Sequence, residues 1–301
     1  MLARHFRGDK PQEAPLDGSE PAVEQVVAPA VSAPAAAPRE PAPVRRPVAE
    51  PAPQAALPEA KVRELMNEGG KLQRDDDFVA ARELYYKALG GVRDAGLRRE
   101  IEQRLGTINV LLVTTPRMMP EKVEYVVQRG DFIQRIARRF GTTVELVQKS
   151  NRISNPNLIK AGDVLRVLQA EFTLEASKSR NDLVVYMDGR FFKRYLVGTG
   201  EFGRTPTGTF EIYDKIVEPV WWRPDGREVP YGDPENILGT RWMAIRATGD
   251  TPAVRGYGIH GTWDNSSIGR AESAGCIRMR NEEVEELYIL VPNGTKVTIV
   301  E

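Results

Sequence analysis

The sequence predicts a multidomain chain with four parts: a disordered Pro/Ala-rich N-terminus, a small α-helical region, a β-α-α-β module and a mainly-β C-terminal domain. Three observations lead to this prediction. The chain has 301 residues, enough for about two domains. Residues 1–58 hold 12 of its 22 prolines. The apolar spacing then changes from the period of a helix to the period of a strand. We expect the boundaries at 1–58, 59–115, 123–168 and 170–301.

The first part, residues 1–58, lacks the composition of a folded domain. It contains 14 alanines and a single aromatic residue, Phe6. Such a segment buries too little apolar surface to offset the entropy lost on ordering. Pro-Ala repeats favour extended conformations. We therefore expect a disordered, semi-stiff linker.

The second part, residues 59–115, shows three apolar stripes at helical spacing. They are Val62, Leu65 and Leu72; then Ala81, Leu84, Tyr85 and Ala88; then Leu97, Ile101, Leu105, Ile108 and Leu112. Asp77 is placed to cap the second helix, and Gly90-Gly91 to end it. Gly70 to Leu89 loosely resembles one tetratricopeptide-type hairpin. Because one such unit cannot form a solenoid, we expect the region to pack on a neighbour or to self-associate.

The third part has the order β-α-α-β in about 45 residues. A short strand at 125–128 precedes Asp131, which is placed to cap a helix carrying Phe132, Ile136, Ala137 and Phe140. Gly141 ends that helix, Thr142 or Thr143 caps the next, and a second strand follows at 164–168.

This part resembles the LysM module over its whole length. The matching residues are Tyr125 to Asp131, Ile136-Ala137, Phe140-Gly141-Thr142, Leu146, Asn151, Leu158-Ile159 and Gly162 to Leu165. The resemblance implies binding of N-acetylglucosamine-containing glycans, such as peptidoglycan or chitin. It places the groove at Gly130, Asp131, Phe132, Ile153, Asn155 and Leu158. In the alternative interpretation, Phe132 and Leu158 only complete a small core.

From residue 171 onward the apolar period is mostly two, which predicts an antiparallel β-rich domain of about 130 residues. The expected strands lie at 172–175, 183–187, 191–197, 209–213, 242–245, 258–260 and 295–300, with Asp188-Gly189 as a hairpin turn and one helix at 282–290.

The C-terminal domain holds the only cysteine, Cys276, and one of only two histidines, His260. The other histidine, His5, lies in the linker. A cysteine attacks as thiolate, and a neighbouring imidazole can take its proton and later return it to a leaving amine. This pattern favours a Cys/His nucleophilic enzyme. In the alternative interpretation, Cys276 is a small buried hydrophobic residue.

The residues around this pair suggest further roles. A backbone carbonyl near Gly261 is a plausible partner for the second imidazole nitrogen. The amides of Gly275 and Cys276 are candidate oxyanion donors. Arg278 has the planar donor fork that suits a substrate carboxylate.

Residues 170–301 resemble the L,D-transpeptidase catalytic domain of the YkuD family. The matching motifs are Gly203 to Phe210, Ile259-His260-Gly261-Thr262 and Ser273 to Met279. The resemblance implies that Cys276, with His260 as base, cleaves the diaminopimelate–D-Ala bond of a peptidoglycan tetrapeptide stem. A second stem amine then takes the acyl group, giving a 3→3 cross-link, and a carbapenem acylates the same thiol. Gly275 and Arg278 join the catalytic set, and Gly261, Thr262, Ser273 and Trp242 the substrate-binding set.

Three alternatives remain open. Water or a protein lysine in place of the stem amine would make an L,D-carboxypeptidase or a protein-attachment enzyme with the same site. Ala274, where many members of the family have histidine or lysine, motivates a third interpretation, a peptidoglycan-binding scaffold without activity. The stretch 218–238, with Trp221, Trp222 and Tyr231, is either an aromatic lid or a packed insertion.

Composition excludes other classes. Lys+Arg and Asp+Glu both number 42, so the basic excess of a nucleic-acid binder is missing. One cysteine rules out an intrachain disulfide and a multi-cysteine zinc site, and we expect no metal or other cofactor. Neither a stretch of roughly 18 apolar residues nor a classical signal peptide is visible. The two resemblances nevertheless imply the bacterial cell envelope, with peptidoglycan as partner.

Overall fold

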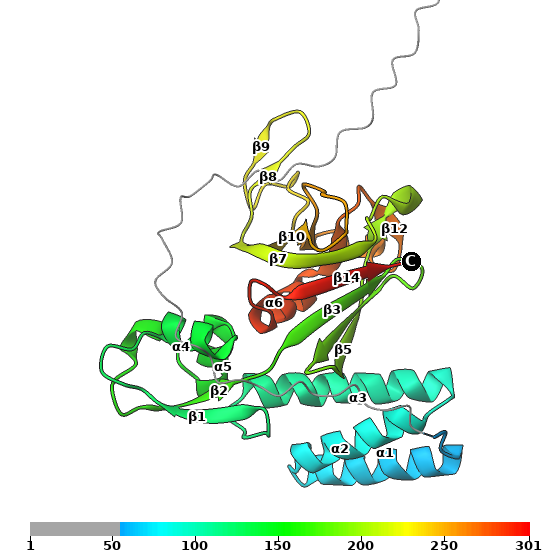
Figure 1. Cartoon of the computed structure of the whole chain (residues 1–301). Coiled ribbons are helices and arrows are strands. Elements are labelled where there is room, and N and C mark those ends of the chain that lie inside the picture. Colours follow the sequence, from blue (N-terminus) through cyan, green and yellow to red (C-terminus); the bar gives the residue numbers. More distant parts are fainter. Residues whose placement is uncertain (1–54) are drawn as a thin grey trace, which may run out of the picture.

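The computed structural model describes residues 55–301 (Figure 1). The linker predicted for residues 1–58 lies almost entirely outside the described residues. Just before the first helix, the side chain of Leu57 packs against Gly91, and its amide donates to the Gly91 carbonyl at 2.9 Å. The described part of the chain thus begins with a contact to the helical region.

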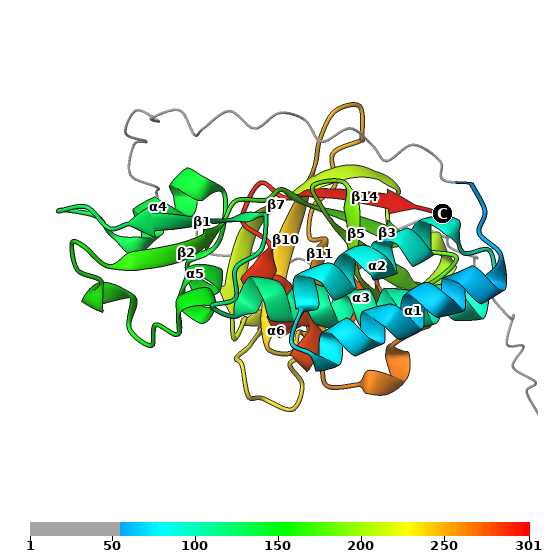
Figure 2. The ribbon, with the colours of Figure 1, turned by 90° about the horizontal axis from the view of Figure 1, so that it is seen from below.

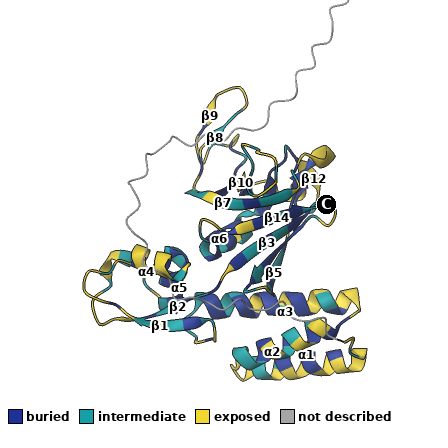
Figure 3. Cartoon of the chain, viewed as in Figure 1, coloured by how far each residue is buried: buried dark blue, intermediate teal, exposed yellow. Residues whose placement is uncertain are grey.

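The helical region forms three helices, as the apolar stripes predict. They are α1 (Glu59–Arg74), α2 (Phe78–Gly91) and α3 (Ala95–Thr114). The side chain of Asp77 accepts a hydrogen bond from the Ala80 amide at 3.1 Å, so the predicted cap is confirmed. Asp94 caps α3 in the same way through the Leu97 amide. The outer faces of α1 and α2 are exposed, whereas α3 is buried along its middle (Figure 3).

The predicted β-α-α-β order of the next part is also confirmed. Its elements are β1 (Lys122–Val126), α4 (Ile133–Phe140), α5 (Val144–Asn151), the short helix η1 (Pro156–Leu158) and β2 (Val164–Leu168), with β1 and β2 antiparallel. The Asp131 cap is wrong. Phe132 is the capping position of α4, and the Asp131 carboxylate instead accepts from the Gln128 amide at 2.8 Å and the Tyr125 hydroxyl at 2.7 Å. Asp131 therefore closes the turn after β1.

The C-terminal domain is built on one eight-stranded sheet in the order β13-β11-β10-β7-β14-β3-β4-β5. The strands of the domain are β3 (Phe172–Ser177), β4 (Asp182–Met187), β5 (Arg190–Leu196), β6 (Thr199–Gly200), β7 (Gly208–Val217), β8 (Trp221–Trp222), β9 (Glu228–Val229), β10 (Arg241–Ala247), β11 (Gly258–Thr262), β12 (Ala271–Ser273), β13 (Ile277–Arg280) and β14 (Lys296–Val300). Helix α6 (Asn281–Leu290) precedes β14, and two short helices, η2 (Glu201–Gly203) and η3 (Asn265–Ser267), lie in loops.

Two features of this sheet differ from the prediction. The pairs β14–β3 and β11–β13 are parallel, so the sheet is mixed and not purely antiparallel. Cys276 is followed by strand β13 and only then by helix α6, and β13 is missing from the strands expected from the sequence. The short strand Ile277–Arg280 carries too few residues to show a period of its own.

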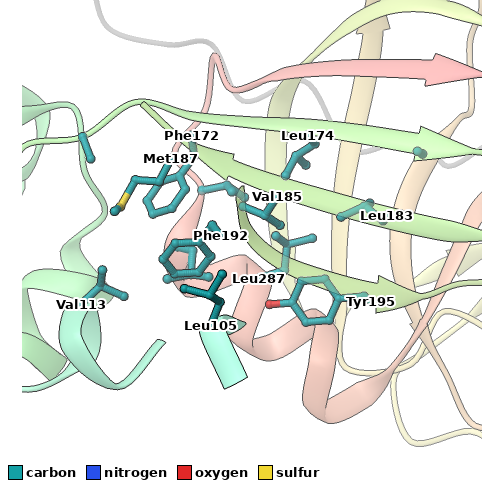
Figure 4. Close-up of a cluster of buried hydrophobic side chains, with 14 of the residues drawn as sticks. Leu105, Val113, Phe172, Leu174, Leu183, Val185, Met187, Phe192, Tyr195 and Leu287 are labelled. Atoms are coloured by element: carbon teal, nitrogen blue, oxygen red, sulfur yellow. The ribbon is translucent and has the colours of Figure 1, made fainter. Parts of the chain in front are cut away.

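The main core joins the helical region to the C-terminal sheet (Figures 2 and 4). Leu105 of α3 lies beside Phe192 of β5, Phe172 of β3 and Leu287 of α6 (Figure 4). The rings of Phe172 and Phe192 meet edge to face with centroids 5.3 Å apart. The helical region therefore packs on a neighbour, one of the two outcomes expected from its sequence.

Buried polar contacts fasten the LysM-like module to both neighbours. Lys122 donates to the Leu112 and Thr115 carbonyls at the end of α3, at 2.6 and 2.5 Å. The Ser150 hydroxyl donates to the Val113 carbonyl at 3.0 Å, and the Thr143 hydroxyl donates to the Ile289 carbonyl of α6. Leu146 of α5 belongs to the main core. The module is thus part of one packed body.

Within residues 55–301, none of the helices is long and apolar enough to cross a membrane.

Candidate active site

The candidate site is a row of side chains across neighbouring strands. In strand register, Trp242 on β10 is paired with His260 on β11, and His260 with Arg278 on β13. Residues one position along these strands, such as Met243 and Ile259, face the main core instead. Because side chains alternate between the two faces of a sheet, Trp242, His260 and Arg278 lie side by side on the opposite face. Cys276 lies two positions before Arg278 and shares that face.

The imidazole of His260 is held in one orientation. Its Nδ1 lies 2.6 Å from the Gly261 carbonyl oxygen, so the expected backbone partner is confirmed. Because a carbonyl only accepts, Nδ1 carries the proton and Nε2 keeps its lone pair. Nε2 is buried and makes no hydrogen bond to the residues that the structure describes. The ring therefore presents a buried basic nitrogen.

The electrostatic surroundings keep this ring neutral. Burial, followed by the positive charge of Arg278, lowers the pKa of His260 from 6.5 to about 4. The carbonyls of Gly261 and Leu238 act in the opposite direction but are outweighed. At neutral pH the imidazole is therefore able to accept a proton.

Cys276 is 3% exposed and packs with Leu238, Trp242 and Ala244. Its Sγ donates to the Gly256 carbonyl over 3.6 Å. The Gly256–Tyr257 segment thus covers the thiol, and Nε2 of His260 makes no hydrogen bond to Sγ among the described residues. Catalytic hydrogen bonds are often made only once substrate is bound.

Two hydroxyl groups fix the loop before Cys276. The Ser273 hydroxyl donates to the Cys276 carbonyl at 2.7 Å and accepts from the Gly275 amide at 3.1 Å. The Thr205 hydroxyl donates to the Gly275 carbonyl at 2.8 Å and accepts from the Gly200 amide at 2.7 Å. Ser273, predicted to bind substrate, therefore holds the loop. The Gly275 amide, predicted to stabilise an oxyanion, would first have to exchange its bond to Ser273.

Gly275 itself is required by the geometry of this loop. Its φ of +137° lies outside the range that residues with a Cβ adopt readily. A Cβ at this position would lie 2.6 Å from Cε1 of Tyr257. The sequence flagged the glycine but gave no sign of Tyr257, whose ring lies against it.

Arg278 remains available for a ligand. Its backbone bonds reciprocally with Gly198, while its side chain makes no ion pair in the described part of the chain, and its Nε is buried without a hydrogen-bond partner. This arrangement suits the predicted role of pairing with a substrate carboxylate.

The other residues predicted to bind substrate form the wall of the site. Trp242 is 2% exposed and stacked on His260, and Gly261 packs against Asn281 and Val284 of α6. The Thr262 hydroxyl accepts from the Asp264 amide at 3.1 Å. In this structure these three residues support the site from within.

The stretch 218–238 is a hairpin, with β8 and β9 paired. Asn236, 1% exposed, donates to the Pro219 and Val229 carbonyls at 2.9 and 3.0 Å and accepts from the Leu238 amide. Trp221 packs against the cluster that contains Cys276. The hairpin is therefore ordered and covers the site. Sequence reasoning missed Asn236, because a lone asparagine in a Pro/Gly-rich stretch carries no periodic signal.

A groove of about 420 Å³ lies on the LysM-like module between α5, η1 and β2. Ile153, Asn155 and Leu158 line it, as predicted, whereas the predicted Gly130, Asp131 and Phe132 are not among its lining residues. Phe132 and Leu158 are 61% and 66% exposed, so the alternative in which they complete a core is wrong.

Comparisons with known proteins agree with both resemblances seen in the sequence. Residues 171–299 match the family described as L,D-transpeptidase catalytic domain, and residues 125–168 match the LysM domain. YkuD of Bacillus subtilis (strain 168), named as an L,D-transpeptidase, is 34% identical over 186 residues, which cover 58% of this chain and 97% of that protein. YqjB of the same organism, named likewise, is 37% identical over 126 residues, covering 42% and 69%. Among solved structures, the catalytic domain of an E. faecium L,D-transpeptidase is 23% identical, with a TM-score of 0.33 over 43% of this chain and 96% of that chain.

Proposed function

Because the chain belongs to the L,D-transpeptidase (YkuD) family and carries a LysM domain before its catalytic domain, we propose that it is a peptidoglycan L,D-transpeptidase with Cys276 as nucleophile. The observation that carries the proposal is the buried, neutral His260, whose Nε2 is directed away from the Gly261 carbonyl on the face of the sheet that also holds Cys276. The alternative of an inactive scaffold is less favoured, because a scaffold has no need of such an arrangement.

In the first half-reaction, Sγ of Cys276 turns from the Gly256 carbonyl toward His260. Nε2 takes the thiol proton, and the sulfur attacks the carbonyl between diaminopimelate and D-Ala of a tetrapeptide stem. The C–N bond breaks as His260 returns its proton to the D-Ala amine. D-Ala leaves, and the tripeptide remains as a thioester on Cys276.

In the second half-reaction, the side-chain amine of another stem attacks the thioester. His260 takes a proton from that amine and returns it to the sulfur as the C–S bond breaks. The product is a 3→3 cross-link. Water or a protein lysine would follow the same path and give hydrolysis or protein attachment.

Arg278 is proposed to pair with a carboxylate of the stem. Its side chain makes no close ion pair with an acidic residue in the described part of the chain, and it lies beside His260. A planar guanidinium binds a carboxylate through two parallel hydrogen bonds. We propose the Cys276 amide as an oxyanion donor, joined by the Gly275 amide if the latter releases Ser273.

The LysM domain is proposed to hold the glycan strand, and the catalytic domain the stem peptide attached to it. We propose a location in the bacterial cell envelope, because both family matches point to cell-wall material as substrate or partner. The exposed Leu158 and the groove beside it support the glycan role.

The test is incubation with a tetrapeptide stem, followed by mass spectrometry. The wild-type protein is expected to release D-Ala and to form the cross-linked dimer. Cys276→Ala and His260→Ala should each lose both products while still binding insoluble peptidoglycan. Activity retained by either variant would refute the assignment, and released tripeptide without dimer would replace cross-linking with hydrolysis.

A carbapenem supplies an independent test, because it acylates a working nucleophile without any acceptor. Intact mass should show one adduct on the wild type and none on Cys276→Ala. A correctly folded wild-type protein without an adduct would favour the inactive scaffold that Ala274 suggested.

A further inference from the structure

Trp242 has a closer relation to the proposed base than to any substrate. It is the strand partner of His260, and the two rings are stacked with centroids 5.6 Å apart and planes 29° apart. Trp242 is 2% exposed and His260 1%. An indole so deeply buried offers a substrate almost no surface.

The chain makes room for this ring at Gly258. A Cβ on Gly258 would lie 2.7 Å from both Cη2 and Cζ2 of Trp242. The indole therefore extends along β11 from His260 to Gly258, two positions earlier. Its other contacts are Leu238, Ala244 and Cys276, so the same ring borders both the imidazole and the nucleophile.

We propose that Trp242 is a positioning residue, which holds the imidazole of His260 in its working orientation and stabilises the imidazolium formed during the reaction. This inference rests on the proposed function, because it assigns the base role to His260.

The charges around His260 explain why such a residue is needed. Arg278 on β13 lies on one side of the ring, and Cys276 is the titratable group on the same face; β10 contributes Trp242, and the segment before it contributes the Leu238 carbonyl. When Nε2 takes the thiol proton, the new positive charge is repelled by Arg278. The face of an indole attracts a cation, most strongly where water is excluded. Trp242 therefore offsets the repulsion at the moment the proton arrives.

Losing the indole should change two measurable quantities, the pKa of His260 and kcat. Without the stacked ring, water reaches His260 and the imidazole gains rotational freedom. Water favours the charged form, so the pKa of His260 should rise from about 4 toward 6.5. Misplacement of the base should lower kcat by about 10- to 100-fold, with little change in KM.

The experiment compares Trp242→Phe, Trp242→Leu and Trp242→Ala, all in a His5→Gln background, so that His260 is the only histidine. The imidazole C–H signal is followed by NMR against pH, and the kinetics of D-Ala release from a tetrapeptide stem give kcat and KM. Phe retains an aromatic face and should keep the low pKa and most of kcat. Leu retains burial without the π face, so it should lose kcat and lower the pKa of His260 further. Ala should lose kcat and raise the pKa by a unit or more.

Trp263→Phe is the matched control. Trp263 is 54% exposed and contacts Tyr231, so the His260 titration should not change. A rise in KM with unchanged kcat in the Phe and Leu variants would overturn the proposal in favour of substrate contact. Equal kcat or an equal His260 pKa in the Phe and Leu variants would also overturn it.

If Trp242→Ala does not fold, the Phe and Leu variants still decide through kcat. The NMR titration uses no substrate. A wild-type protein that releases no D-Ala would therefore contradict the proposed function, while the titration would still test the effect of Trp242 on His260.

Discussion

At the scale of single residues, the site depends on a histidine that folding forces to stay neutral. Burial is the larger cause of its low pKa, and the charge of Arg278 is the second. The unfolded chain has no such constraint, and its imidazole titrates near 6.5. This difference couples the stability of the protein to pH.

The predicted consequence is a loss of stability on mild acidification. Between pH 6.5 and 4 the unfolded chain binds a proton at this histidine and the folded chain does not, so the free energy of unfolding falls as the pH falls. Above pH 6.5 His260 does not lower the free energy of unfolding, because it is neutral in both states. By pH 4 its protonation in the unfolded chain has lowered the free energy of unfolding by about 3 kcal/mol. Urea unfolding at several pH values measures it.

His260→Gln should lack this part of the pH dependence, whereas His5→Gln should retain it. An equal pH dependence in the wild type and His260→Gln would show that the imidazole is not held neutral by the fold.

The Thr205 hydroxyl holds the loop before Cys276, so its removal should disturb that loop. Thr205→Val keeps the shape but leaves the Gly200 amide and the Gly275 carbonyl without their partner. Each unmet buried group costs about 1–3 kcal/mol. We expect lower stability and slower acylation of Cys276, measured by thermal unfolding and by the rate of carbapenem adduct formation.

Thr207→Val, two residues away in the same motif, is the control. Thr207 is exposed, and its side chain makes no hydrogen bond within residues 55–301. An equal effect of the two substitutions would refute the role given to Thr205.

At the scale of elements, the sequence predicted most helices and strands but few of their partners. The stripes of α1 to α3 and the alternation in β3, β4 and β10 are local signals, so they survive without tertiary information. The parallel pairing of β11 with β13 is not local, and it alone places Arg278 beside His260. Cys276 and His260 could be singled out from the sequence because each residue type is nearly unique in the chain, and the structure places both on one face of the sheet. The sequence did not predict which residues surround the thiol, because only the folded chain brings Trp242, Gly256 and Tyr257 close to Cys276.

The hairpin at residues 218–238, beside the site, depends on the side chain of one buried residue, Asn236. Asn236→Ala removes three hydrogen bonds that hold residues 219, 229 and 238 together. We expect a loss of about 2–4 kcal/mol and a hairpin that opens more often. Limited proteolysis should then cut within 219–237, and hydrogen exchange there should quicken.

Glu235→Ala is the comparison for this prediction. It removes only exposed ion pairs to Arg223 and Arg227, which contribute little to stability. If both variants open the hairpin equally, the buried amide is not its main support.

At the scale of the whole molecule, the three folded parts form one body. Apolar patterns show which face of a helix is buried but not what covers it, so the sequence left open whether the helical region packs internally or self-associates. In the structure, α3 packs against β5, and the LysM domain is hydrogen-bonded to α3 and α6. The LysM domain therefore holds a fixed orientation relative to the catalytic sheet.

A substitution of Lys122 tests whether the LysM domain is part of the same packed body. Its ammonium group, 4% exposed, donates to the Leu112, Thr115 and Arg117 carbonyls. Lys122→Met keeps an aliphatic side chain but leaves those carbonyls without a hydrogen-bond donor. The free energy of unfolding should fall by about 2–4 kcal/mol. Calorimetry is expected to show a single transition for the wild type and a separate, earlier one for the LysM domain in the variant.

Lys149→Met, an exposed change in the same domain, should leave the single transition intact. Two transitions already present in the wild-type protein would contradict the union of the parts.

The bond from Cys276 to the Gly256 carbonyl has a consequence for chemical durability. Peroxide oxidises a thiolate that it can reach, and the Gly256 carbonyl oxygen lies 3.6 Å from Sγ of Cys276. The resting sulfur is also 3% exposed. The sequence has no second cysteine that could convert a sulfenic acid into a disulfide, so the access of peroxide to this sulfur decides how long the thiol survives. The Gly256–Tyr257 segment beside the sulfur thus shields the thiol from oxidation.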